Sequence, residues 1–106
     1  MTVYMQSTLE LRAIDTTHFE AAMTELVGIV EAEGWHLVTA IQQISGRLHT
    51  AIDVWTLPDL GAYQRGLAAL RSHARFADIA QQLAAAIERE TVVFGVQAAW
   101  VPEGRA

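Results

Sequence analysis

The sequence has 106 residues, 52 % of them hydrophobic, and a net charge of −5. Its seven basic residues are all arginine and are scattered, so it lacks the basic stripe with which proteins bind nucleic acid. Because it contains neither cysteine nor lysine, disulfides, thiolate catalysis and Schiff-base chemistry are excluded. A hydrophobic content this high leaves apolar surface for a partner or a ligand.

No segment has the pattern of a signal peptide or a membrane span. Residues 1–11 lack a basic segment followed by an apolar run. The apolar-rich run at 91–101 is shorter than the ~20 residues that cross a bilayer. We therefore expect a cytoplasmic protein without membrane contact, and the length predicts one domain over residues 1–106.

The first two predicted elements are a strand and a helix. Residues 2–11 alternate between apolar and polar side chains, which is typical of a half-buried strand. Thr17 and Glu20 form a capping-box pattern that begins a helix, and an apolar stripe follows from Phe19. Gly34 is the expected end of this helix, because glycine readily adopts the left-handed conformation found there.

A β-hairpin is predicted next, with strands at 36–44 and 48–55 and a tight turn at Ser45-Gly46-Arg47. A two-residue loop, at either Ser45-Gly46 or Gly46-Arg47, places eight residues on one face of the sheet. They are His36, Val38, Ala40, Gln42, His49, Ala51, Asp53 and Trp55. A three-residue loop would pair the two sets of side chains the other way.

The second predicted helix begins near Pro58, with Thr56 and Asp59 as capping residues. Its apolar stripe comprises Leu60, Tyr63, Leu67 and Leu70. Gly61 and Gly66 each weaken such a helix by roughly 1 kcal/mol relative to alanine.

A third helix is predicted over 74–90, with Ser72 as its N-cap. The β-branched and aromatic run at 91–100 predicts the last strand. The whole order, strand, helix, strand, strand, helix pair, strand, predicts an α+β, ferredoxin-like split βαβ fold with one four-stranded antiparallel sheet and its helices on one face. The bare face is too apolar to meet water over a whole sheet, which favours a homodimer.

The stretch LHTAIDVWTLPDLGAYQRGLAAL resembles the strand, Trp, turn, helix signature of NIPSNAP-like proteins of the dimeric α+β barrel superfamily. The related antibiotic-biosynthesis monooxygenases share this pattern and a His-containing stretch similar to RSHARFADI. The resemblance implies a dimer of face-to-face sheets with a pocket beside each sheet. It also implies one of several activities, since the monooxygenases oxidise polycyclic phenols without metal or flavin and other relatives are isomerases or cyclases. This chain has no Asn, so a mechanism that uses an Asn side chain cannot be transferred unchanged.

The first candidate site lies on the predicted hairpin face. His49, Asp53 and His36 are the candidate catalytic residues, since a His beside a carboxylate in an apolar pocket can act as a general base, and Gln42 is a candidate ligand contact. The alternative is that both His residues are exposed near strand ends and that Asp53 only pairs with an arginine such as Arg12 or Arg65. His49 and Asp53 lie about 13 Å apart along a strand, which argues against direct contact.

Two further candidate sites follow from the helices. Trp55 and Tyr63 flank the strand-to-helix turn and can hold a planar ligand by stacking, or else pack in the core. His73, between Arg71 and Arg75, can hold an anionic substrate group at a helix start, or else lies in an exposed loop with surface ion pairs.

The spacing of the four His residues matches no metal-binding motif, and there is no phosphate-binding loop, so we expect neither metal nor cofactor. Two functions remain open. One is a cofactor-independent enzyme, an oxygenase or an isomerase or cyclase, acting on a hydrophobic, aromatic or polyketide-like substrate. The other is a non-catalytic NIPSNAP-like module that binds a ligand or a protein.

Overall fold

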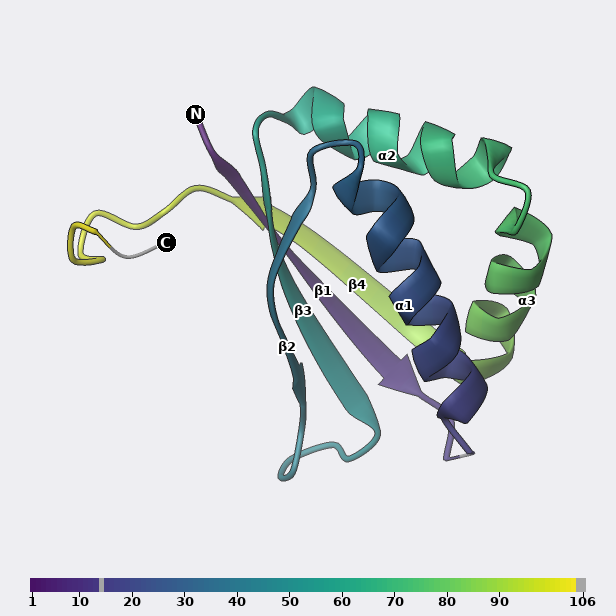
Figure 1. The fold of residues 1–106 in the computed structure, drawn as a ribbon. Coiled ribbons are helices and arrows are strands. Elements are labelled where there is room, and N and C mark those ends of the chain that lie inside the picture. Colours follow the sequence, from purple (N-terminus) through teal and green to yellow (C-terminus); the bar gives the residue numbers. More distant parts are fainter. Residues whose placement is uncertain (14, 105–106) are drawn as a thin grey trace.

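The predicted element order is confirmed by the computed structural model, which describes residues 1–13 and 15–104. The elements are β1 (Val3–Leu11), α1 (Thr17–Glu31), β2 (His36–Gln42), β3 (Thr50–Leu57), α2 (Leu60–Ser72), α3 (Phe76–Ala86) and β4 (Ile87–Gly95). The strands form one antiparallel sheet in the order β2-β3-β1-β4. All three helices lie on the same side of it (Figure 1). The α+β, ferredoxin-like fold class is therefore confirmed.

The two faces of the sheet follow from the alternation of its strands. The covered face, under the helices, carries Met5, Ser7, Leu9, Leu11, Ala51, Asp53, Trp55, Leu57, Glu90, Val92 and Phe94. The open face carries Tyr4, Gln6, Thr8, Glu10, Ile52, Val54, Thr56, Arg89, Thr91 and Val93. The alternation predicted for the first strand is thus confirmed.

Helix α1 begins at Thr17, one residue earlier than a capping box at Thr17 predicts, and with different capping contacts. The carboxylate of Asp15 accepts hydrogen bonds from the Thr17 backbone N–H (2.9 Å) and hydroxyl (2.6 Å). Glu20 accepts a hydrogen bond from the hydroxyl of Thr16 instead of closing a capping box with Thr17. The capping-box prediction is wrong because Thr17 is already helical. Gly34 has a φ of +96°, as expected for the turn that ends the helix.

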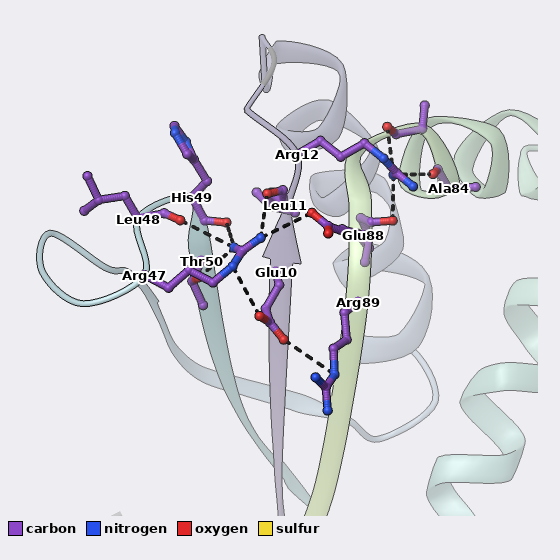
Figure 2. Close-up of polar contacts among 12 residues, drawn as sticks. Glu10, Leu11, Arg12, Arg47, Leu48, His49, Thr50, Ala84, Glu88 and Arg89 are labelled. Atoms are coloured by element: carbon purple, nitrogen blue, oxygen red, sulfur yellow. Dashed lines mark hydrogen bonds and ion pairs between the residues drawn. The ribbon is translucent and has the colours of Figure 1, made fainter.

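The prediction of a tight hairpin turn is also wrong, because β2 ends at Gln42 and β3 begins only at Thr50. The intervening loop, 43–49, is held down by Arg47 (Figure 2). The Arg47 guanidinium pairs with the carboxylates of Glu10 (3.2 Å) and Glu88 (3.4 Å) and donates to nearby backbone carbonyls. A loop held by these contacts, and not a tight turn, therefore connects β2 to β3.

His36 does not lie on the predicted face of the sheet, because a β-bulge occurs between Leu37 and Thr39. Beyond the bulge, Ala40 lies opposite Asp53 and Gln42 lies opposite Ala51, which is the expected register. Before it, Leu37 lies opposite Trp55 and His36 opposite Thr56. The extra residue reverses the alternation, so His36 lies on the open face and not beside Asp53.

The N-cap and the length of the third helix also differ from the prediction. Asp59 caps α2 as expected, its carboxylate accepting from the Ala62 N–H at 2.8 Å. Ser72, the predicted N-cap of the third helix, instead ends α2, and Arg75 precedes α3.

The predicted helix over 74–90 is too long because α3 ends at Ala86. Ile87 is already paired with Leu11 of β1, so the four residues from Ile87 to Glu90 belong to β4. Strand β4 ends at Gly95, and residues 96–104 extend away from the helices (Figure 1). No helix within residues 1–13 and 15–104 is long and apolar enough to cross a membrane.

Candidate functional site

A cavity of about 370 Å³ lies between the covered face and the three helices. Buried apolar residues form three separate clusters, and the cavity touches each of them, for example at Trp55, Leu9 and Leu70. Protein interiors are normally close-packed, and a void in the core is destabilising. A volume in this range is typical of small-molecule sites. The cavity is therefore the candidate binding site.

Asp53 is the buried ionisable residue of this cavity. Only 5 % of it is exposed, and no side chain of residues 1–13 and 15–104 donates a hydrogen bond to its carboxyl group or forms an ion pair with it. Burial, and after it the negative charge of Glu90, raises the pKa of the Asp53 carboxyl from 3.8 to about 6. The carboxyl is thus an acceptor without a partner among the described side chains, and it lines a mainly apolar cavity.

Ser7 and Glu90 complete a polar group on three adjacent strands. Ser7 lies opposite Asp53 on β1, and Glu90 occupies the neighbouring register of β4 on the same face. The Ser7 hydroxyl donates to Glu90 Oε2 at 3.3 Å. Both residues line the cavity with Asp53. The site therefore combines one hydroxyl and two carboxyl groups.

An aromatic cluster forms one wall of the cavity. The rings of Trp35 and Trp55 meet edge to face with centroids 5.3 Å apart, and Trp35 stacks on Tyr63 at 5.5 Å. The Trp35 indole N–H donates to the carbonyl of Ala62 at 2.7 Å, which fixes the ring against α2. This contact needs Gly66, because a Cβ there would lie 2.2 Å from the indole nitrogen. The glycine that weakens the helix in isolation is what lets Trp35 pack.

A second cavity of about 340 Å³ lies between α1 and β2. Asp53 and Met23 line both cavities, so the carboxyl lies at the junction of the two under α1. Gln42 lines the second cavity and shares the covered face with Asp53. Asp53 thus shares the first cavity with Trp55 and Tyr63 and the second with Gln42.

The three predicted histidines lie elsewhere. His49 is exposed in the loop before β3, and its φ of +61° takes it out of the strand geometry from which its face was predicted. His36 is exposed on the open face, 3.9 Å from Glu31. His73 is exposed between α2 and α3, where its Nδ1 accepts from the Arg75 N–H. Arg75 is itself paired with Glu25 and Asp78, so its charge is already balanced.

Three residues of the site were missed by the sequence reasoning: Ser7, Glu90 and Trp35. Ser7 carried a signal, because it is the one polar residue in the inward register of a strand whose other inward positions are apolar. Glu90 was hidden by the overlong third helix. Trp35 follows the turn at Gly34 and belongs to no periodic pattern. Among residues 1–13 and 15–104, no three His, Asp or Glu side chains are grouped to hold a metal ion.

Solved structures with this fold include an uncharacterised NIPSNAP domain protein from Burkholderia xenovorans. It is 22 % identical, the match covers 97 % of this chain and 100 % of that one, and the TM-score is 0.76. A NIPSNAP family protein of unknown function from Agrobacterium tumefaciens is 16 % identical over 95 % of this chain and 92 % of its own, with a TM-score of 0.80.

SnoaB, a cofactor-independent oxygenase from Streptomyces nogalater, is 13 % identical over 96 % of this chain and 98 % of its own, with a TM-score of 0.70. No protein-family model matches the chain, and no curated protein matches its sequence. The chain therefore has a NIPSNAP-like fold that SnoaB shares, and the resemblance seen in the sequence is confirmed at that level.

Proposed function

We propose that the protein binds an apolar small molecule in the cavity and acts on it as a cofactor-independent enzyme, with Asp53 as the proton acceptor. The observation that carries this proposal is the buried Asp53 carboxyl, which faces the cavity without a partner among the described side chains. With a pKa of about 6, it is still ionised at neutral pH yet holds a proton more strongly than an exposed aspartate. Trp55 and Tyr63 would form the apolar wall, and Gln42 would contact a substrate that extends under α1.

Two kinds of reaction use such a base without a cofactor. In an isomerase or cyclase, Asp53 takes a proton from one substrate atom and returns it to another, so nothing else is consumed. In an oxygenase, the deprotonated substrate passes four electrons to O₂, so that a CH₂ group and O₂ become C=O and water. The fold shared with SnoaB supports the oxygenase type, and a hydrophobic, aromatic or polyketide-like substrate suits the aromatic wall.

Native mass spectrometry of the purified protein tests the binding step. A mass above that of the bare chain by one discrete small molecule identifies the ligand class. Oxygen uptake with a polycyclic phenol then tests the chemistry, and Asp53→Asn should abolish uptake while the phenol still binds. Asp78→Asn, which removes an exposed carboxylate, is the control and should leave uptake unchanged. Uptake by Asp53→Asn at the unsubstituted rate would contradict the proposed role of Asp53.

The second candidate is a non-catalytic module that binds a ligand or a protein. It is favoured by the positions of the histidines, because none of the described ones lines the cavity that holds Asp53. A bound molecule recovered chemically unchanged after long incubation with oxygen, together with the absence of isomerisation, would favour this candidate over the enzyme.

The open face is proposed as the surface that pairs with a second copy of the chain. Val93 is 52 % exposed there, and Ile41 of β2, which lies opposite Ile52, is 51 % exposed. Apolar side chains spread over three strands are costly to leave in water. Sedimentation showing only an 11.6 kDa species at micromolar concentration would contradict the homodimer.

A further inference from the structure

The charges in the cavity all have the same sign. Asp53 and Glu90 are the charged residues among those that line it, and no described Arg or His lines it. Elsewhere in the described chain, carboxylates commonly have a cation nearby, as Glu10 has Arg47 and Arg89. The lining thus combines a buried carboxyl, Asp53, with a solvent-exposed one, Glu90, and no described residue of the lining is a counter-ion.

This arrangement discriminates between ligands by charge. An anionic ligand would add a negative charge beside the buried Asp53, where charges are screened less than in bulk water, so its binding is opposed. A neutral ligand can donate a hydrogen bond to Asp53 but leaves the buried charge uncompensated. A ligand cation both donates to the carboxylate and balances its charge, which recovers part of the cost of burying it.

The aromatic wall favours the same kind of ligand. Trp35, Trp55 and Tyr63 form one connected cluster, and all three line the cavity with Asp53. The electron-rich faces of such rings attract organic cations, and most strongly where water is excluded. The same rings provide a flat apolar surface for the uncharged body of a ligand.

We propose that the cavity takes a cationic amphiphile: an organic ammonium ion on an aromatic or similarly apolar body, with the ammonium held by Asp53 and Glu90 and the body against Trp35, Trp55 and Tyr63. The proposal rests on the proposed function only in that the cavity is a ligand site, and it adds a positively charged group to the apolar, aromatic ligand proposed for that site. Ser7 is a positioning residue, since its hydroxyl donates to Glu90 and holds that carboxylate at the cavity.

Three probes with one apolar body and different charges test the proposal: naphthylmethylammonium, naphthylmethanol and naphthoate. We expect calorimetric titration at neutral pH to show that the ammonium binds about tenfold more tightly than the alcohol, the equivalent of ~1.4 kcal/mol. Naphthoate should bind more weakly than the alcohol. Asp53→Asn and Glu90→Gln should each reduce the preference for the ammonium and leave the affinity for the alcohol nearly unchanged.

Glu88→Gln is the matched control, because it removes the same charge two residues away on β4, where the side chain pairs with Arg47 and not with the cavity. It should keep the preference for the ammonium. Equal binding of the ammonium and the alcohol, or a preference that survives Asp53→Asn, would overturn the cationic ligand and leave the proposed cavity intact. Failure of all three probes to bind would overturn the cavity as a ligand site as well.

Discussion

Glu10 on the open face of the sheet and Asp53 on the covered face differ in both exposure and ion pairing. On the open face, Glu10 is partly exposed, yet it has two arginine partners, Arg47 and Arg89 (Figure 2). On the covered face, Asp53 is 5 % exposed and has no cation beside it within the described residues. A chain selected for stability alone would arrange these the other way, because a charge needs a partner most where water is absent. The contrast indicates that the covered face gives up stability to keep a reactive or ligand-binding group.

The largest expected effect comes from the aromatic wall of the covered face. Gly66→Ala should lower the free energy of unfolding by about 3 kcal/mol, because the new Cβ would lie within 2.8 Å of three atoms of the Trp35 ring. Gly28→Ala is the matched control in α1, where a Cβ meets no atom within 4 Å, and it should raise stability by about 1 kcal/mol. Denaturant unfolding measures both changes. A stabilising Gly66→Ala would show that Trp35 does not need this glycine.

The sequence could predict this fold but not this role of Gly66. Strand alternation and helical stripes are local, and they located every helix and strand to within a few residues. The bulge in β2, the close approach of Trp35 to α2 and the early end of α3 depend on contacts between distant segments. Counting along the hairpin strands placed Asp53 and Trp55 on the correct face, because alternation within a strand is local. It placed His36 on the wrong face, because the bulge lies between His36 and the rest of the hairpin.

The second largest effect concerns the free energy of unfolding that is lost because the buried Asp53 carboxyl is unpaired. Folding raises the pKa of Asp53 from 3.8 to about 6, so the folded protein holds this proton more tightly than the unfolded chain. The stability that this proton contributes is present below about pH 4 and is lost as the pH rises through about 6. The loss amounts to roughly 2–3 kcal/mol, since a tenfold change in proton affinity is worth ~1.4 kcal/mol. Asp53→Asn should remove it.

Thermal unfolding of the ligand-free protein checks this prediction across the pH range. At about pH 8 the Asp53→Asn variant should unfold at a higher temperature than the unsubstituted protein, and at about pH 4 the two should nearly coincide. Asp78→Asn serves as the control, since it loses only an exposed ion pair and should gain nothing at either pH. A lower unfolding temperature for Asp53→Asn at about pH 8 would mean that the carboxylate has a stabilising partner.

A charged substitution on the open face is expected to weaken the dimer and to leave the fold of each chain unchanged. Val93→Glu places a charge among the exposed apolar side chains of this face and should raise the dimer dissociation constant by about 30-fold. Leu60→Glu makes the same change on α2, where Leu60 is 59 % exposed, and should leave the dimer intact. Sedimentation at several concentrations separates the two results. If Val93→Glu associates as strongly as the unsubstituted chain, the dimer uses another surface.

The smallest effect is expected where the charges are already paired. Arg47→Ala removes contacts to Glu10, Glu88 and the carbonyls that hold loop 43–49, yet the side chain is 42 % exposed, so the loss should be only about 1 kcal/mol. Arg65→Ala, which breaks one longer pair with Asp59, should cost less than half of this. High salt should shrink the ion-pair part of the Arg47 effect.

Hydrogen exchange should locate that loss in residues 43–49 and in the adjoining ends of β1 and β3, with the strands around Asp53 unaffected. The pH dependence of stability that Asp53 causes should also survive in Arg47→Ala, because Arg47 does not line the cavity. If Arg47→Ala instead altered that pH dependence, the charges of the open face would act through the sheet, and the two faces could not be treated as independent.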